Sequence, residues 1–271
     1  DDTMAYSSGM YIKPNETLMD AQINKFQLMF ERLDLKPEHT LLEIGSGWGG
    51  FAIYAAGTYG CRVTTTTISV EQHRLATLRI AEAGLSDQID VLLKDYRDLE
   101  GTYDKLVSVE MVEAVGHQFL DDYFQKCADL LAPHGRAAIQ AITVRDDWYD
   151  PKQRQVDFIK RYIFPGSFIP SVSALSSAAG KTDMRIVHLE DQGPHYAETL
   201  RRWRVAFMEN WPRIRALGFD EQFRRLWDFY FCYCESGFDE AILGCVQVVW
   251  AKPASKGAIG THLQGRIEAV A

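Results

Sequence analysis

The sequence predicts an α/β fold in which a mostly parallel sheet carries helices on both faces. Three observations support this prediction. Strand-like and helix-like segments alternate between residues 40 and 143, the first strand runs into a glycine-rich loop, and 46% of the 271 residues are hydrophobic, enough to bury a large core. Because strands joined through helices make right-handed crossovers, they are expected to lie parallel in one sheet.

The first two strands and two helices are predicted between residues 40 and 84. Residues 40–45 (TLLEIG) are short and apolar, as in a buried strand, and residues 49–60 form a helix that ends at a glycine. Residues 62–69 (RVTTTTIS) are rich in β-branched residues, which strands favour. Residues 70–84 have the apolar spacing of an amphipathic helix, again closed by a glycine.

The rest of the chain supplies more strands and a segment of different character. Strands are predicted at 89–95, 103–111 and 136–143, with a helix at 119–133. From about residue 148 to residue 237 the sequence is rich in aromatic residues and prolines in helical patterns, typical of an insertion covering the sheet. Residues 241–253 return to a strand pattern. The chain is therefore predicted to form one domain over residues 1–253, followed by a tail at 254–271.

Composition argues against several classes of protein. A net charge of -8 argues against a nucleic-acid partner, whose binding surface would be basic. No stretch approaches the roughly 18 consecutive apolar residues of a membrane-spanning helix, and the first residues lack the pattern of a signal peptide. Five scattered cysteines suit reduced thiols in a cytoplasm, and Cys232 and Cys234 lack the second pair that a metal site would need. No metal is expected.

The glycine-rich loop predicts a ligand site at the end of the first strand. Gly45, Gly47 and Gly50 match the pattern G-x-G-x-x-G, which lets the backbone approach a ligand closely. A dinucleotide site would need an acidic residue about 20 positions further on, where this chain reads TTTTIS. Glu43, two residues before the first glycine, is instead typical of S-adenosylmethionine (SAM) sites. There a carboxylate can bind or orient the α-amino group or the sulfonium.

Seven segments, taken in order, resemble one enzyme family. The chain is similar to the catalytic domain of the cyclopropane-fatty-acyl-phospholipid synthases and mycolic acid cyclopropane synthases. The similarity covers about residues 1–253 and begins partway into the family pattern. The segments are YSSGMY (6–11), LEIGSGWGG (42–50), TTISVEQ (66–72), KDYRDL (94–99), VSVEMVEAVG (107–116), RYIFPGSFIPS (161–171) and CESGF to VQVVWAKP (234–253).

This resemblance implies a seven-stranded, Rossmann-like methyltransferase sheet that holds SAM. It places Tyr6 and Ser7 at the methionine end of the cofactor, and Gly45 and Gly47 beneath it in the loop. The ribose is expected to contact Thr67, Ile68 and Gln72, and the adenine Asp95, Tyr96 and Arg97. Glu43 completes the predicted cofactor site.

The resemblance also implies a reaction. The methyl group of SAM is attacked by the π electrons of an isolated cis double bond, which leaves a carbocation. Loss of a proton from the new methyl group closes a cyclopropane, whereas loss from a neighbouring chain carbon leaves a methyl-branched or methylene-bearing alkene. A base in a dry pocket must therefore take the proton from one side. In the family that base is thought to be a bicarbonate held by Cys, Glu, His, an Ile backbone and Tyr.

The chain keeps only part of this bicarbonate set. The Glu is retained as Glu113, but Ser8 replaces the Cys, Gln140 replaces the His and Arg204 replaces the Tyr. Two interpretations stay open. The new side chains all donate hydrogen bonds and could still hold the anion. Alternatively Arg204 pairs with Glu113 or Glu110 and no bicarbonate binds, which would favour a branched product over a ring. Glu110, where the family has a small residue, is a further candidate base or cation stabiliser.

Three functional interpretations therefore remain. The first is SAM-dependent transfer of one carbon to the cis double bond of an acyl chain on a phospholipid, with a ring or a branch as product. The second is methylation of a soluble small molecule, and the third is a lipid-binding or desaturase-like protein that transfers no methyl group. Residues 157–171 combine aromatic side chains with Lys160 and Arg161, which suits peripheral contact with the inner face of a membrane from the cytoplasm. A homodimer is also considered.

Overall fold

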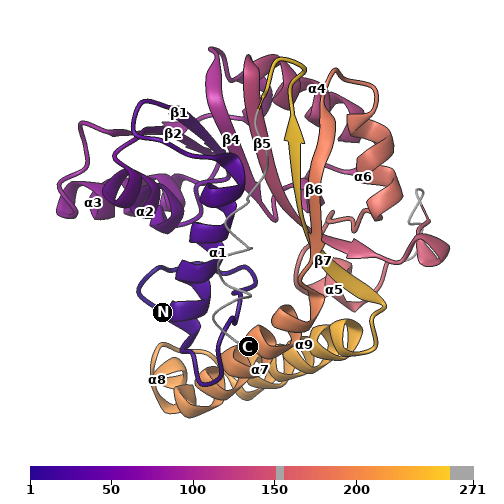
Figure 1. Cartoon of the computed structure of the whole chain (residues 1–271). Helices are drawn as coiled ribbons and strands as arrows, with labels where there is room; N and C mark the ends of the chain where they lie inside the picture. The colour runs from indigo at the N-terminus through magenta and orange to yellow at the C-terminus, as the bar shows by residue number, and fades with distance from the viewer. Residues whose placement is uncertain (151–155, 257–271) are drawn as a thin grey trace.

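A computed structural model describes residues 1–150 and 156–256, and its centre is one twisted sheet (Figure 1). Within these residues the sheet has seven strands in the order β3-β2-β1-β4-β5-β7-β6. β1 to β5 are parallel, and β7 runs antiparallel to β5 and β6. The strands are β1 (Thr40–Ile44), β2 (Arg62–Thr67), β3 (Ile89–Leu93), β4 (Tyr103–Val109), β5 (Leu131–Val144), β6 (Arg185–Asp191) and β7 (Leu243–Ala251). The predicted fold class is confirmed.

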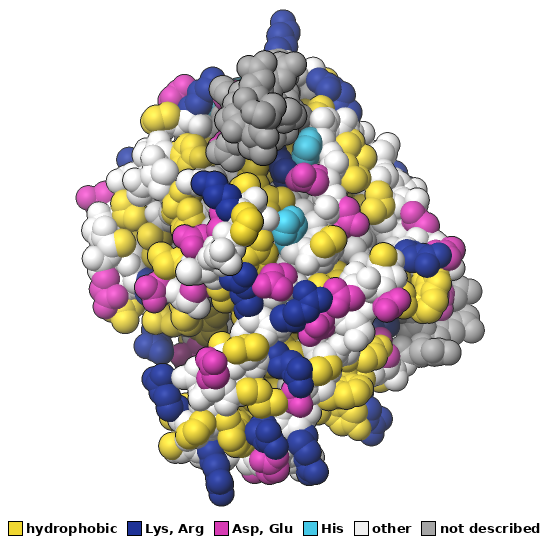
Figure 2. All heavy atoms as spheres, turned by 60° about the horizontal axis from the view of Figure 1, so that its bottom comes forward, with side chains coloured by type: hydrophobic (Ala, Val, Ile, Leu, Met, Phe, Trp, Pro, Cys, Tyr) yellow, Lys and Arg dark blue, Asp and Glu magenta, His cyan; other side chains and the backbone are white. Residues whose placement is uncertain are grey.

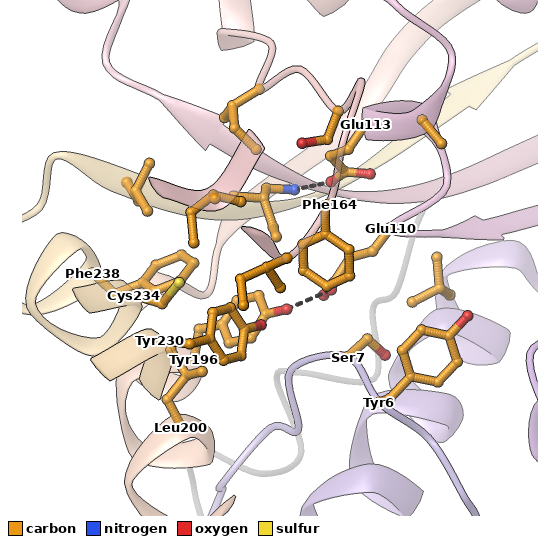
Figure 3. A pocket seen from close by; sticks show the side chains of 18 of the residues that line it. Tyr6, Ser7, Glu110, Glu113, Phe164, Tyr196, Leu200, Tyr230, Cys234 and Phe238 are labelled. Carbon is orange, nitrogen blue, oxygen red and sulfur yellow. Dashed lines mark hydrogen bonds between the residues drawn. The ribbon is translucent and has the colours of Figure 1, made fainter. Parts of the chain in front are cut away.

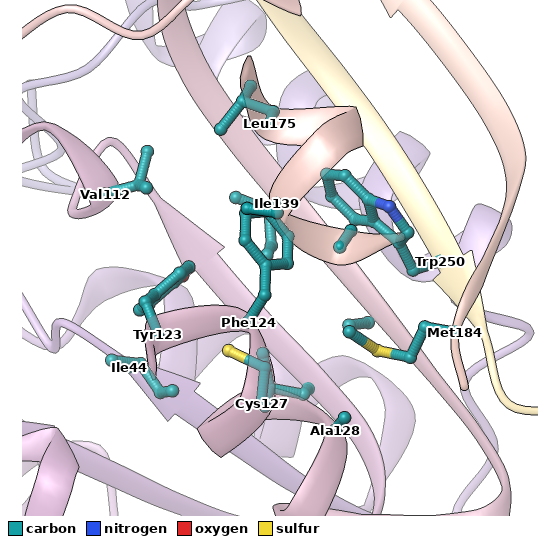
Figure 4. Packing of buried hydrophobic residues seen from close by; sticks show 14 of the residues in the cluster. Ile44, Val112, Tyr123, Phe124, Cys127, Ala128, Ile139, Leu175, Met184 and Trp250 are labelled. Carbon is teal, nitrogen blue, oxygen red and sulfur yellow. The ribbon is translucent and has the colours of Figure 1, made fainter. Parts of the chain in front are cut away.

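Helices cover both faces of this sheet. One apolar cluster packs α1 (Leu18–Leu33), α2 (Gly50–Tyr59) and α3 (Val70–Glu82) on one face, and another packs α4 (Leu120–Leu130) and α6 (Val172–Ala179) on the other. Neighbouring strand residues such as Leu41 and Leu42 enter opposite clusters, because side chains alternate across a strand. In the second cluster the rings of Phe124 and Trp250 meet edge to face with centroids 5.1 Å apart (Figure 4).

A helical unit lies at one end of the sheet, at the bottom of Figure 1. α7 (Gly193–Glu209), α8 (Trp211–Ala216) and α9 (Glu221–Asp239) form it together, and α5 (Phe158–Tyr162) packs against α9 through Phe158 and Phe229. Their apolar side chains form a third cluster with β7. None of the described helices has the length and apolar character to cross a membrane. Short 3₁₀ turns complete the elements: η1 (Tyr96–Asp98), η2 (Val112–Ala114), η3 (His117–Phe119) and η4 (Asp146–Trp148).

The structure differs from the sequence prediction in three elements. The segment expected to be helical at 148–237 contains strand β6, which is mostly exposed at the sheet edge and therefore lacks an apolar pattern. Helix α1 was not predicted, although Thr17 caps it and its acidic N3 residue completes a capping box. The predicted helix at 119–133 ends at Leu130, and the following residues begin β5. Most of the predicted tail, from residue 257, lies outside the described residues.

Candidate active site

A large cavity opens beyond the carboxyl ends of β1 and β4, between the sheet and the helical unit (Figure 3). Its volume is about 1110 Å³, at the upper end for ligand pockets and enough for a nucleoside cofactor together with part of a second molecule. Its walls include the first residues of the chain, the glycine loop, the turn after β4, part of α1, helices α7 and α9, and α5 with the segment that follows it. This is the position at which open α/β sheets bind their ligands.

The glycine loop forms one wall, and the first residues of the chain lie across it. Gly45 has a φ of +100°, and the amides of Gly45 and Ser46 both donate to the carbonyl of Thr66 at 3.1 and 2.9 Å. A Cβ on Gly50 would lie 2.1 Å from the carbonyl oxygen of Thr3, so this glycine is required by the close approach of the chain. The loop and this N-terminal segment together make a cradle that fits SAM.

Glu43 supplies a buried carboxylate to the same wall. The side chain is 3% exposed, and its Oε2 accepts a hydrogen bond from Thr65 Oγ1 at 2.6 Å. Burial raises the pKa of Glu43 to about 8. A cation placed in the cavity would stabilise the ionised form, and the α-amino group and sulfonium of SAM are both cationic. The residue therefore suits the role that the sequence predicts.

The predicted ribose contacts lie at the end of β2, beside the cavity. Thr67 Oγ1 donates to Gln72 Oε1 at 2.9 Å, and Gln72 Nε2 donates to the hydroxyl of Tyr6 at 3.1 Å. Ile68 is 76% exposed and free to cover a ligand. Since Tyr6 also lies against Gly47, these contacts connect the N-terminal segment to the predicted ribose site.

The predicted adenine contacts follow β3. Asp95 caps η1 and forms an ion pair with Arg97 at 2.8 Å, and this hydrogen bond lowers the pKa of Asp95. The ring of Tyr96 packs edge-on against Tyr123 with centroids 5.5 Å apart. Of the eleven predicted cofactor residues, the structure brings five directly to the cavity wall: Tyr6, Ser7, Glu43, Gly45 and Gly47. The other six lie along the adjacent strand ends.

Glu110 has an unusual backbone conformation at the cavity wall. Its φ of +51° lies in the left-handed region, which a residue with a side chain adopts at an energetic cost and which often marks a functional site. Its Oε1 accepts the backbone N–H of Ser8 at 3.2 Å and the amide of Gln140 at 2.8 Å. Its Oε2 accepts the hydroxyl of Tyr196 at 2.6 Å, the bond that is drawn in Figure 3. The chain thus holds a carboxylate in a cage of donors.

A second carboxylate, Glu113, shares the cavity. Its Oε1 accepts the backbone N–H of Ile142 at 2.5 Å, and its buried Oε2 has no hydrogen-bond partner among the described residues. Burial, and then the nearby charge of Glu110, raise the pKa of Glu113 to about 8. Burial also raises the pKa of Glu110, but the bond from Tyr196, the charge of Lys25 and the bonds from Gln140 and Ser8 oppose that rise. Because three donors contact the carboxylate of Glu110 and only one contacts that of Glu113, we assign the negative charge to Glu110 and the proton to Glu113.

Two of the predicted catalytic residues, Ser8 and Gln140, contact the carboxylate of Glu110, although not in the way expected. Gln140 binds Glu110 directly, whereas Ser8 uses its backbone N–H and turns its hydroxyl to the carbonyl of Gly9 at 2.9 Å. The predicted pairing of Arg204 with Glu113 or Glu110 is wrong. Its Nε donates to Asp228 Oδ1 at 2.6 Å, so Arg204 joins α7 to α9 away from the cavity.

The motif matches the family's Tyr to Arg204, but in the structure the tyrosine hydroxyl at the site comes from Tyr196. Both residues lie on α7, but eight residues of helix turn the side chain by about 80° from the starting direction. Tyr196 and Leu200 consequently face the cavity, while Arg204 faces Asp228. No motif marked Tyr196, because its neighbours in GPHYAETL are ordinary helix residues.

Lys25 is the second residue that the sequence analysis missed. Its side chain is fully buried on α1, lines the cavity and donates to Ser7 Oγ at 2.7 Å. Burial lowers the pKa of Lys25 to about 8. A signal was present in the sequence: Lys25 occupies the same helical stripe as Ala21, Met29 and Leu33, where a lysine would normally be excluded.

Arg204→Gln is expected to leave catalysis at this site within about twofold of the parent chain. The ion pair with Asp228 is largely exposed, with side-chain exposures of 43% and 34%, and such pairs contribute at most about 1 kcal/mol to stability. The measurement is the initial rate of the purified variant with saturating SAM. A loss of tenfold or more would place Arg204 in the reaction after all.

Comparison with known proteins agrees with this site. The family model of mycolic acid cyclopropane synthetase matches residues 1–248. The chain is 40% identical to the tuberculostearic acid methyltransferase of Mycobacterium tuberculosis over 91% of the chain and 60% of that protein. It is 34% identical to the cyclopropane-fatty-acyl-phospholipid synthase of Escherichia coli over 95% of the chain and 64% of that protein. The chain thus spans less than two thirds of the length of these two relatives.

Solved structures show the same arrangement. The cyclopropane synthase MmaA2 from Mycobacterium tuberculosis superposes with a TM-score of 0.86 at 27% identity, covering 93% of this chain and 91% of that one. A mycolic acid cyclopropane synthase in complex with S-adenosylhomocysteine and CTAB gives a TM-score of 0.86 at 28% identity, with the same coverage. The chain therefore belongs to the mycolic acid cyclopropane synthetase family, whose relatives are SAM-dependent methyltransferases and cyclopropane synthases.

Proposed function

We propose that this chain transfers the methyl group of SAM to the double bond of an unsaturated acyl chain on a phospholipid. We further propose that Glu110, and not a bound bicarbonate, takes the proton that leaves afterwards. The product is then a methyl-branched or methylene-bearing chain. One observation carries this proposal: the carboxylate of Glu110 accepts the donors of Ser8, Gln140 and Tyr196, so the anion of the site is part of the protein.

The same contacts argue against a bicarbonate ligand. Gln140 and the Ser8 backbone already donate to Glu110, the Ser8 hydroxyl is turned to Gly9, and the Ile142 amide donates to Glu113. A second anion would also lie beside the charged carboxylate of Glu110 in a buried cavity, where repulsion is strong because water screens it poorly. The residues present do not fit bicarbonate, and no step of the proposed reaction passes through it.

The chain's own residues have separate tasks in the proposed reaction. SAM, when bound, supplies an electrophilic methyl group, to which the π electrons of the double bond form the new carbon–carbon bond as the methyl–sulfur bond breaks. Ser7, Glu43 and the glycine loop hold the cofactor in place. Glu110 and the ring of Tyr230, which lines the cavity, stabilise the positive charge left on the acyl chain. For a methyl-branched alkene, the electrons of a C–H bond on a chain carbon next to the cation form the new double bond, and the proton passes to Glu110. For a methylene group, a hydride first shifts from the methyl-bearing carbon to the cation, and the proton that passes to Glu110 then leaves the new methyl group.

The acyl chain has an apolar path to this point. Ile163, Phe164, Leu200 and Phe238 line the cavity beyond Glu110. Around the same cavity, Trp148, Phe164 and Phe229 are 59%, 49% and 52% exposed, unusually high for such large apolar side chains. We infer that these aromatic residues meet the lipid surface from which the substrate enters.

A peripheral membrane contact is consistent with the adjacent surface. In Figure 2 the end of the molecule formed by α7, α8 and α9 is turned forward, and hydrophobic side chains there are interspersed with Lys and Arg and also with Asp and Glu. The predicted segment 157–171 contributes only in part. Tyr162 is 56% exposed beside Arg161, whereas Phe168 is 5% exposed and belongs to the core. Apolar anchors among basic residues suit the interface of an anionic membrane.

Transfer of radiolabel from methyl-labelled SAM to a mono-unsaturated phospholipid tests this proposal. The assay is run in buffer depleted of carbon dioxide and again with added bicarbonate. Equal rates of labelling are expected in the two buffers, because Glu110 is the base. A rate that rises severalfold with bicarbonate would contradict the role of Glu110, and SAM binding without labelled lipid would contradict the lipid substrate.

A further inference from the structure

A row of polar side chains crosses three neighbouring strands beneath α1 and ends at Glu110. Glu190 on β6 is paired with Gln247 on β7, and Gln247 is paired with Gln140 on β5, so the three residues share one line across the sheet. Gln140 is 0% exposed and Gln247 is 2% exposed. Polar side chains this deeply buried must satisfy one another, and their hydrogen bonds are therefore closely specified.

Each contact in this row is a direct hydrogen bond. The guanidinium of Arg32, on α1, donates to Glu190 Oε2 and to Gln247 Oε1. Gln247 Nε2 donates to Gln140 Oε1 at 2.9 Å, and Gln140 Nε2 donates to Glu110 Oε1 at 2.8 Å. A continuous series of hydrogen bonds thus connects the guanidinium of Arg32, at one end of the row, to the carboxylate of Glu110 in the cavity.

The direction of these bonds follows from the chemistry of Arg32. A guanidinium can only donate, so Gln247 must turn its oxygen toward it and its N–H₂ toward Gln140. Gln140 must then present its own oxygen to Gln247, which leaves its N–H₂ to face Glu110. Without Arg32 both amides could turn over together and keep the bond between them. The oxygen of Gln140 would then face Glu110, which only a protonated carboxyl group tolerates.

We propose that Arg32 is a positioning residue that acts through Gln247 and Gln140 to keep a donor directed at Glu110. This inference rests on the proposed function for its catalytic meaning, because an ionised Glu110 is needed only if Glu110 is the base. The orientation of the two amides, and its effect on the ionisation of Glu110, does not depend on the reaction. It can therefore be tested on the folded protein without substrate.

Other charged and titratable groups face Glu110, and the variants leave all of them in place. They come from five elements, each of which contributes one group. They are Lys25 on α1, Glu113 on η2, Tyr196 on α7, Tyr230 on α9 and Cys245 on β7. A change in the titration of Glu110 after substitution at Arg32 or Gln247 would consequently report the row itself.

The experiment is a ¹³C NMR titration of the Glu110 carboxyl group in protein labelled at glutamate, with the signal assigned by its loss in Glu110→Gln. Arg32→Met and Gln247→Met are the test variants, and thermal unfolding establishes that each one is folded. Because hydrogen bonds to a charged group are strong, each substitution is expected to raise the pKa of Glu110 by about one unit. The acid limb of the rate profile should move upward by the same amount.

Gln247→Met distinguishes an effect of the hydrogen bonds from an effect of the charge of Arg32, because this substitution changes no charge. If Arg32 acted through its charge alone, Gln247→Met would leave the titration unchanged. Glu190→Gln removes a charge beside Arg32 but none of the hydrogen bonds that connect Arg32 through Gln247 and Gln140 to Glu110. It is the matched control and should shift the pKa of Glu110 by less than about 0.3 unit. An unchanged titration in Gln247→Met would overturn the proposal. Failure of methyl transfer, with the shift present, would instead overturn only the proposed function.

Discussion

Glu110→Gln should lower kcat for methyl transfer by about 10²- to 10⁴-fold, the usual range for loss of a general base. Glutamine has the shape of glutamate: its oxygen can still accept the hydrogen bond of Ser8, and its amide can donate to the hydroxyl of Tyr196. However, it cannot take a proton or balance the positive charge of the reacting chain. The affinity for SAM should stay within about threefold, since the cofactor cradle lies at the glycine loop and Glu43. The measurement is single-turnover kinetics together with calorimetric binding of SAM.

Glu110→Gly provides the matched rescue. Glycine adopts the observed φ of +51° without strain, so this variant relieves the backbone while it removes the carboxylate. The donors of Ser8, Gln140 and Tyr196 are then free to hold a small anion. Activity should be low and should rise with added bicarbonate or formate, in contrast to the parent chain. If neither Glu110→Gln nor Glu110→Gly loses activity, Glu110 is not the base.

Lys25→Met should make the protein more stable and less active. The pKa of Lys25 is about 8 in the folded chain, against 10.5 for a lysine in water, a difference worth roughly 3 kcal/mol against folding when the amine is charged. Loss of the bond to Ser7 offsets about 1 kcal/mol of the gain, so about 2 kcal/mol should remain at pH 7. The KM for SAM should rise about tenfold, because Ser7 loses its fixed partner and Glu110 its nearest cation.

The pH dependence distinguishes the removal of a buried charge from an effect of packing alone. Below pH 8 the amine of Lys25 is charged in both the folded and the unfolded chain, and the cost of burying the charge is fully present. Between about pH 8 and 10.5 only the unfolded chain holds the proton, so the penalty declines and the advantage of Lys25→Met shrinks. Urea unfolding at pH 7 and pH 9.5 measures this. Gln22→Met is the control: Gln22 is equally buried on α1 and bonds the Ser7 carbonyl at 2.8 Å, so its loss should destabilise equally at both pH values.

The sequence predicted the part of the fold that depends on strong local patterns. The strands β1, β2 and β4 are buried and apolar or β-branched, and the turn after β1 needs glycine, so both the sheet and the position of the cavity could be inferred. Strand β6 could not, because an exposed edge strand need not alternate. Helix α1 was overlooked for a similar reason: its buried stripe is interrupted by Gln22, Lys25 and Arg32, which are there to reach the site and not to fill the core.

The candidate site was predicted by residue type but not by direction. Glu110 and Glu113 line the cavity because they follow β4, and Gln140 reaches Glu110 from within the neighbouring strand β5. Arg204 lies away from the cavity and binds Asp228, because a motif match on a helix does not determine the direction of each side chain. Tyr196, on the same helix, contacts Glu110 instead. The links through Gln247 and Arg32 join residues far apart in the chain, and only the folded sheet brings them together.

The most direct test of the whole account is the structure of the product. The protein is incubated with SAM and a mono-unsaturated phospholipid, and the released fatty acids are analysed by mass spectrometry before and after ozonolysis. The account predicts a gain of one carbon in a chain that ozone still cleaves, as expected of a methyl-branched or methylene-bearing alkene. A gain of one carbon in a chain that resists ozone would show a cyclopropane and would contradict the proposed product.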